Sequence, residues 1–187
     1  HALEEQFSSS FTALRRITQV IPADGAVSYS TYGSALGHDP VQCGSPTDTV
    51  FLNQWTTQGS GGTYHGFVTF ALAVLGAPGA SNVLEAATLT ATQATSEAGF
   101  YTTHQVNLAK LAYRGLDKTL FSAAVENDFG LFVSSASTLN PSKDVLSAVK
   151  ADFDAGKTSL LFKLVTTSGS ADGFDAHFLC GGFSLTV

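Results

Sequence analysis

Alternation of apolar and polar residues runs through most of the chain and predicts β-strands. The clearest case is Gly66–Leu72, where we expect Phe67 and Phe70 to lie on one face of a strand. A Gly- and Pro-containing loop, Leu75–Asn82, then leads to a second alternating stretch, Val83–Ala94. Two such stretches joined by turn residues are typical of an antiparallel sandwich in which each strand buries one face.

The same pattern predicts six further strands, and turn residues separate them. These strands are Asp24–Tyr32, Val50–Thr56, Tyr101–Ala112, Phe129–Ser134, Thr158–Thr166 and Phe178–Val187. Gly33–Asp48 contains three Gly and two Pro and is expected to be a long loop. Gln58–Thr63 and Ser168–Gly173 are expected to be turns.

One stretch, Asn140–Gly156, has helical periodicity. Asn140 is placed to cap a helix that starts at Pro141, and Gly156 is placed to end it. Its apolar stripe comprises Val145, Leu146, Val149 and Phe153. With eight to ten strands and this single short helix, the chain is predicted to be an all-β, jelly-roll-like antiparallel sandwich.

The first residues differ from the rest, and we divide the chain into an N-terminal arm, residues 1–16, and a β-sandwich domain, residues 17–187. Apolar residues recur in the arm and just after it at steps of three and four, namely Phe7, Phe11, Leu14 and Ile17. Arg15–Ile21 also fits a strand, so the arm is either helical or extended. We expect the arm to pack on its own domain or on a neighbouring molecule.

Charge excludes some classes of partner. Only 13% of the residues are charged, and the net charge is −6 with nine Lys and Arg in total. A nucleic-acid-binding protein needs a basic face, so no nucleic-acid partner is expected. No apolar run reaches membrane-spanning length, so no membrane insertion is expected. A surface of hydroxyls and amides favours an extracellular or cell-surface location, or close packing between subunits.

The two cysteines, Cys43 and Cys180, lack the spacing of a zinc site. They form either one disulfide, which would fit an oxidising compartment, or two buried thiols. The chain starts at His1, which we interpret as the first residue of a secreted, processed protein or as a residue introduced by cloning.

The order of features resembles the DNRLRE-type jelly-roll domains of secreted bacterial, archaeal and fungal proteins. That family has a Phe-containing strand, a Pro/Gly loop and an "AtL.L" strand, which match Gly66–Leu72 and Ala86–Thr90. Its "DVT.aV" helix and terminal "LtV" match Asp144–Val149 and Leu185–Val187. Some members are classed as carbohydrate-binding modules, so the resemblance implies a sandwich that binds a polysaccharide.

Binding of a glycan requires exposed aromatic faces beside hydrogen-bonding groups. A candidate patch comprises Trp55, Asn53, Gln54, Tyr64 and His65, on either side of the Gly-rich turn. The alternative is that Trp55 fills the core, where large aromatic residues usually lie.

Two metal sites are also considered. Asp172 and Asp175, with Asp128, are candidate ligands of a structural calcium ion, although a solvated Asp-Gly turn is the simpler explanation of the first two. A copper site would use His1 with a second histidine. The candidates for that histidine are His38, His65, His104 and His177.

No catalytic motif is present, since the chain contains no GxSxG sequence and its acidic residues lie mostly singly in turns. We therefore expect a protein that is not an enzyme and requires no cofactor. Two functions follow. The first is a secreted structural protein that self-assembles, for example into a filament, through its N-terminal arm. The second is a carbohydrate-binding module.

Overall fold

The computed structural model describes residues 16–32, 35–55, 62–79, 82–94, 105–134, 138–167 and 174–187. For residues 30–32, 35–42, 51, 53–55, 62 and 174–177 the description covers the backbone alone. Within these ranges the chain forms twelve strands, one α-helix and three short 3-10 helices. All strand pairs are antiparallel, so the predicted all-β class is confirmed.

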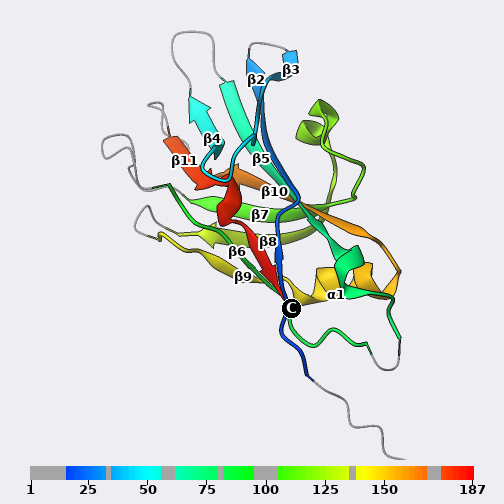
Figure 1. Ribbon diagram of the computed structural model, residues 1–187. Coiled ribbons are helices and arrows are strands. Elements are labelled where there is room, and N and C mark those ends of the chain that lie inside the picture. Colours follow the sequence, from blue (N-terminus) through cyan, green and yellow to red (C-terminus); the bar gives the residue numbers. More distant parts are fainter. Residues whose placement is uncertain are drawn as a thin grey trace, which may run out of the picture.

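The smaller sheet has four short strands that come from widely separated parts of the sequence. Their order is β1 (Val20–Pro22), β12 (Ser184–Thr186), β6 (Thr88–Thr90) and β9 (Ser142–Asp144). Figure 1 shows β12 (red) lying beside β1 (blue) near the C-terminus. The first and last described strands are therefore paired with each other.

The larger sheet has eight strands. Six lie in the order β11 (Phe174–Leu179), β4 (Thr49–Trp55), β5 (Gly62–Ala71), β10 (Ser159–Thr166), β7 (Val106–Leu111) and β8 (Val125–Val133). The remaining two are β2 (Gly25–Tyr32), which pairs with β5, and β3 (Ala35–Gln42), which pairs with β2. The β2–β3 and β4–β5 hairpins project at the end of the molecule opposite the C-terminus (Figure 1).

Strand β5 is the centre of the larger sheet. It pairs with β2 along one edge. Along its other edge, Gly62–Tyr64 pair with β4 and Gly66–Ala71 pair with β10. Gly66 lies where the partner changes, and a Cβ atom there would lie 2.6 Å from Cγ1 of Val50. Close approach of the three strands therefore requires glycine at this position.

The main core lies between the two sheets. It contains Ile21, Leu89 and Leu185 from the smaller sheet and many apolar residues from the larger one. Several aromatic rings pack against one another within it, in the pairs Phe70–Phe162, Phe129–Phe162, Phe132–Phe178 and Phe178–Phe183. Such a core is expected for a sandwich of this kind.

A second apolar cluster covers the outer face of the larger sheet. It comprises Val27, Tyr29, Phe67, Leu111, Leu120 and Leu161. Phe67 belongs to this cluster and Phe70 to the main core, so the prediction that both lie on one face is wrong. Residues three apart on a strand face opposite sides, because the side-chain period is two. Both rings are buried because each face of β5 is covered.

The helix α1 (Leu146–Asp154) is shorter than predicted. Residues 142–144 form strand β9, and the Asp144 carboxylate, not Asn140, accepts the hydrogen bond of the first helical N–H group at 2.9 Å. The cap at Asn140 and the start at Pro141 are therefore wrong, because pairing with β6 holds the preceding backbone extended. The apolar stripe packs on the core, and Gly156 ends the helix with a φ of 70°, as predicted.

Several predicted boundaries also change. Strand β3 lies within Gly33–Asp48, where a loop is predicted; it contains Pro40, which an outer strand tolerates. Within the predicted strand Val83–Ala94, only Thr88–Thr90 forms a strand (β6), and Gln93 makes an isolated antiparallel bridge with Phe178 of β11. The predicted last strand is interrupted by the 3-10 helix η3 (Cys180–Gly182), which separates β11 from β12.

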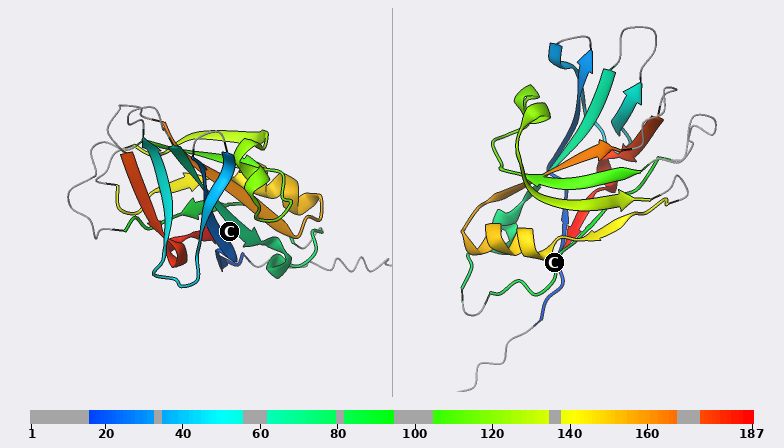
Figure 2. Two further views of the ribbon diagram at one scale, coloured as in Figure 1. Left: turned by 90° about the horizontal axis from the view of Figure 1, so that it is seen from above. Right: turned by 180° about the vertical axis from the view of Figure 1, so that it is seen from behind.

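The other two 3-10 helices are η1 (Leu72–Leu75) after β5 and η2 (Lys118–Ser122) between β7 and β8. Figure 2 shows α1 at the end of the molecule near the C-terminus and η2 beside the outer face of the larger sheet. None of the helices in the described part of the chain is long and apolar enough to cross a membrane. The architecture is an antiparallel β-sandwich with one short helix, as the sequence predicts.

Candidate functional site

The predicted glycan patch is located on strands β4 and β5. Backbone pairing places Asn53 opposite Tyr64, Gln54 opposite Thr63 and Trp55 opposite Gly62. The side chains of residues 53–55 lie outside the description, so the prediction for Trp55 stays a prediction. Tyr64 and His65 are consecutive strand residues and face opposite sides of the sheet, so they do not share one patch.

His65 instead belongs to a group of side chains under η2, which we call the η2-covered cluster. This cluster comprises Tyr29 on β2, His65 and Phe67 on β5, Lys163 on β10 and Phe121 on η2. Cross-strand pairing brings Tyr29 opposite His65 and Phe67 opposite Lys163. The sheet register therefore collects three ionisable side chains beside the apolar residues of the second cluster.

Lys163 is only 8% exposed, yet it makes no ion pair with any described residue. Its Nζ donates a hydrogen bond to the Phe121 carbonyl oxygen at 2.8 Å. The same Nζ lies 5.9 Å from the ring centre of Phe67 and 5.8 Å from that of Phe121, within the range of cation–π attraction. Burial lowers the pKa of Lys163 below its ordinary value.

The imidazole of His65 stacks on Phe121, with ring centres 4.0 Å apart and planes inclined by 5°. Burial, and secondly the charge of Lys163, lower the pKa of His65 to about 3, although a backbone hydrogen bond with Phe121 acts in the opposite direction. The imidazole is therefore neutral at neutral pH. Its Nδ1 atom has no hydrogen-bond partner among the described atoms.

Asp117 begins the helix that covers the cluster. Its Oδ1 accepts hydrogen bonds from the Thr119 backbone N–H at 2.7 Å and from the Thr119 hydroxyl at 2.5 Å. These hydrogen bonds lower the pKa of Asp117, so the carboxylate stays charged. Burial, followed by the charge of Asp117, raises the pKa of Tyr29.

The arrangement of these groups stabilises the packing of η2 on the sheet. Phe121 covers the ring of His65, and Lys163 directs its hydrogen bond to the backbone of η2. Each cation–π contact of this kind contributes about 0.5–2 kcal/mol. A sugar ring cannot stack on the imidazole face that Phe121 occupies.

Tyr29, Phe121 and Lys163 belong to this cluster although the sequence-based predictions do not include them. A signal exists for Lys163, because a lone cation stands in the apolar strand TSLLFKLVT. No comparable signal exists for Phe121, whose place over His65 depends on the path of the segment between β7 and β8.

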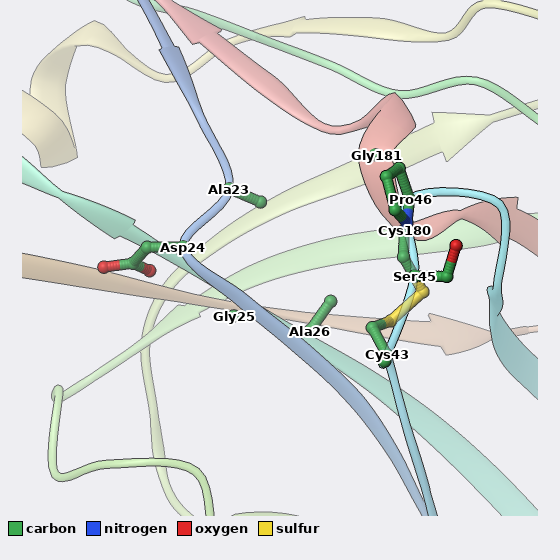
Figure 3. Close-up of a pocket in the computed structure, with 10 residues that line it drawn as sticks. Ala23, Asp24, Gly25, Ala26, Cys43, Ser45, Pro46, Cys180 and Gly181 are labelled. Atoms are coloured by element: carbon green, nitrogen blue, oxygen red, sulfur yellow. A yellow bond between two sulfur atoms is a disulfide. The ribbon is translucent and has the colours of Figure 1, made fainter.

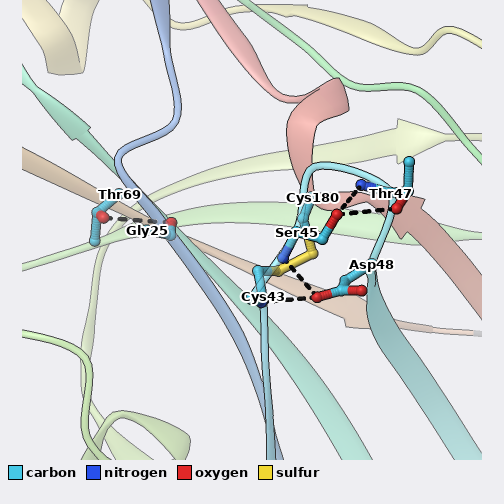
Figure 4. Close-up of a disulfide and its surroundings, with 8 residues drawn as sticks. Gly25, Cys43, Ser45, Thr47, Asp48, Thr69 and Cys180 are labelled. Carbon is cyan, nitrogen blue, oxygen red and sulfur yellow. Dashed lines mark hydrogen bonds between the residues drawn. A yellow bond between two sulfur atoms is a disulfide. The ribbon is translucent and has the colours of Figure 1, made fainter.

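Cys43 and Cys180 form a disulfide, with their Cα atoms 6.0 Å apart (Figure 4). The loop between β3 and β4 is held on η3 by backbone hydrogen bonds as well, from Cys180 N to Asp48 O at 2.8 Å and from Gly181 N to Pro46 O at 2.9 Å. The Asp48 carboxylate accepts bonds from the N–H groups of residues 44 and 45, both at 2.7 Å. The disulfide thus joins two segments that are already hydrogen-bonded.

A pocket of about 280 Å³ lies beside the disulfide (Figure 3). Asp24 and Ser45 supply its polar side chains, and much of the remaining lining is Gly, Ala and Pro. Figure 3 shows the Asp24 carboxylate pointing away from the disulfide, and this group accepts a hydrogen bond from the Thr69 hydroxyl at 2.5 Å. We therefore assign no ligand to this pocket.

The structure does not unite the candidate calcium ligands. Asp128 accepts a hydrogen bond from the Gly130 N–H at 2.8 Å, whereas Asp172 lies outside the described residues. Asp175 is placed by its backbone alone, on β11, at the opposite end of the strand order from Asp128 on β8. Among the residues described, no three His, Cys, Asp or Glu side chains group as a metal site.

Most of the candidate copper ligands have no described side chain. His1 and His104 are not described, and His38 and His177 are placed by their backbones alone, on β3 and β11. His65, the remaining candidate, stacks on Phe121.

The arm residues Phe7, Phe11 and Leu14 also lie outside the described residues. Ile17, the fourth predicted assembly residue, is described and is 68% exposed. It precedes β1, which forms one end of the smaller sheet.

No protein-family model matches the chain, and no curated protein is significantly similar to it. The resemblance to DNRLRE-type domains therefore stays a prediction that rests on the sequence motifs.

Proposed function

We propose that this protein is a secreted, non-enzymatic structural protein that assembles with copies of itself through its N-terminal arm, residues 1–16. The observation that carries the proposal is the position of β1. This strand follows the arm directly and stands at one end of the smaller sheet, paired with β12 among the described residues. On the edge that faces away from β12, β1 offers the N–H and C=O groups of Val20 and the C=O group of Pro22, which has no N–H.

Exposed apolar side chains at this edge support the proposal. Ile17 and Val20 are 68% and 60% exposed, while Ile21 is buried in the main core. A soluble domain gains nothing from large apolar side chains in water, and an adjoining copy would cover them. Low overall charge also suits close contact between copies, because few charged groups lose their water.

The arm leaves the sandwich from a fixed point. Gln19 exchanges two backbone hydrogen bonds with Val187, at 2.8 and 2.9 Å. Before Gln19, the described contact between the arm and the sandwich is an ion pair between Arg16 and Glu85, 2.7 Å long. Both side chains are largely exposed. Such a pair contributes about 0–1 kcal/mol, so it does not oppose docking of the arm on a neighbour.

The proposed contact is insertion of the arm's apolar residues into a neighbouring copy. Phe7, Phe11 and Leu14 would supply the buried side chains, and head-to-tail repetition would give an open chain of subunits. The Cys43–Cys180 disulfide supports an extracellular or cell-surface location, because disulfides persist in oxidising compartments.

Deletion of Ala2–Leu14 tests this proposal. The deleted chain should remain folded by circular dichroism, but it should give only the monomer in analytical ultracentrifugation. Trp55→Ala is the matched control and should leave assembly unchanged, because Trp55 lies on β4, in the other sheet from β1. An assembly that survives the deletion would refute the role of the arm.

A second candidate, a carbohydrate-binding module, is favoured by one observation. Backbone pairing of β4 with β5 brings Asn53 and Trp55 beside Gly62–Tyr64, so aromatic and amide residues are neighbours at the tip of this hairpin. The DNRLRE resemblance points to the same function. Loss of polysaccharide binding in Trp55→Ala, with assembly intact, would establish it. A calcium ion bound by Asp172 and Asp175, without Asp128, is tested by repeating both assays with and without a chelator.

A further inference from the structure

A buried pair of opposite charges connects the helix to the larger sheet. Lys110 on β7 and Asp152 on α1 are 2% and 5% exposed. Their side chains meet with Lys110 Nζ 2.8 Å from Asp152 Oδ2. The neighbouring residues Leu108 and Phe153 belong to the main core, so little water reaches the contact.

Two further charged side chains complete the arrangement. Glu126 on β8 contacts the same Nζ atom of Lys110 through its Oε2. Lys157, just after α1, lies with its Nζ 2.7 Å from Oδ1 of Asp152. Each oxygen of Asp152 therefore faces a different lysine, and Lys110 faces two carboxylates.

We propose that Lys110 and Asp152 condense into an amide cross-link inside the folded protein. The bond that forms joins Lys110 Nζ to Asp152 Cγ, and the bond that breaks joins that Cγ to Oδ2. Two protons move from the ammonium group to Oδ2, which leaves as water. Nothing is oxidised or reduced, and the net charge is unchanged, because the ion pair and the amide are both neutral.

The other two residues have separate parts in this reaction. Glu126 accepts a proton from Nζ and returns it to Oδ2, so it ends in its starting state. Lys157 donates to Oδ1, which becomes the carbonyl oxygen and carries negative charge as the amine adds. Asp152 raises the pKa of Lys157, so this donor keeps its proton.

The fold supplies what condensation requires. The reacting groups are held in contact by a packed strand and a packed helix, which gives the amine a very high effective concentration. A buried, water-poor site favours uncharged groups over separated charges and limits hydrolysis of the product.

Another lysine–aspartate pair provides an internal control. Lys150 and Asp154 lie on the same helix, with Lys150 Nζ 2.9 Å from Asp154 Oδ2, but their side chains are 40% and 50% exposed. This pair has almost the same separation without burial. No cross-link is expected there.

Mass spectrometry of the intact full-length protein tests the proposal. The wild-type chain, with its disulfide formed, should be lighter than its sequence mass by one further water molecule. After tryptic digestion, a branched peptide should join the segments that contain Lys110 and Asp152, whereas Lys150 and Asp154 should be unlinked. A wild-type protein that lacks only the two hydrogen atoms lost to the disulfide, measured after prolonged incubation in the folded state, would overturn the proposal.

Two variants examine the chemistry. Lys110→Arg keeps the charge but removes the amine and should show no loss of water, only the loss of two hydrogen atoms to the disulfide. Glu126→Gln keeps Lys110 and Asp152 in place and should cross-link much more slowly. Cross-linking at the wild-type rate in Glu126→Gln would overturn the role of Glu126. The wild-type mass decides the main question even if either variant fails to fold.

Discussion

Removal of the disulfide by the double substitution Cys43→Ala and Cys180→Ala should lower stability without changing the native fold. The two cysteines are separated by 137 residues, so the bond closes a very long loop in the unfolded chain. For a loop of that length, the chain-entropy relation gives about 5 kcal/mol at 25 °C. The native contact should persist, because two backbone hydrogen bonds join residues 46 and 48 to η3 independently of the sulfur atoms.

Equilibrium unfolding in urea, followed by circular dichroism, measures this loss. For 187 residues the entropy of unfolding is about 0.4 kcal/mol/K, so the midpoint of thermal unfolding should fall by about 13 °C. The dependence of unfolding free energy on urea should steepen, because an unfolded chain without the cross-link exposes more surface. The reduced wild-type protein is the control and should match the double variant.

A loss of less than about 1 kcal/mol in unfolding free energy, with unchanged spectra, would contradict this prediction. That result would mean that the unfolded chain keeps the two segments together without the disulfide.

Two other predictions follow from close packing and from buried charge. Gly66→Ala should lower the unfolding free energy by about 1–3 kcal/mol, because the added methyl group would overlap Val50. Gly79→Ala is the control and should not lower it, because its added methyl group meets open space. Equal losses for the two variants in urea unfolding would contradict this prediction. Unfolding free energy should fall as pH drops from about 6.5 to about 3, because only the unfolded state protonates His65 in that range. His65→Leu should flatten that slope, and an unchanged slope would show that His65 is not its source.

The sequence predicts the strands of this sandwich well where alternation is strong. Asp24–Tyr32 corresponds to β2, and Thr158–Thr166 corresponds to β10 within one residue. Local pattern fails for β3, because its Gly and Pro residues indicate a loop and its strand conformation depends on pairing with β2. It also fails at β9, where pairing with β6 replaces the expected first turn of the helix.

Side-chain clusters are less predictable than strands, because they depend on how the strands pair and on which distant segment packs over them. His65 appears suitable for a glycan patch until Phe121, from a distant 3-10 helix, covers its ring. Similarly, Lys110 stands in the strand VNLAKL with no local sign that α1 supplies Asp152. In both cases the partner lies more than 40 residues away in the sequence, so local periodicity cannot predict the contact.

Self-assembly through the N-terminal arm is tested by the molar mass of the native full-length protein, measured by light scattering over a range of concentrations. We expect species heavier than the 19.4 kDa chain, whose mass increases with concentration and falls to that of the monomer when the arm is deleted. A single 19.4 kDa species at every concentration would contradict self-assembly and leave carbohydrate binding as the function to test.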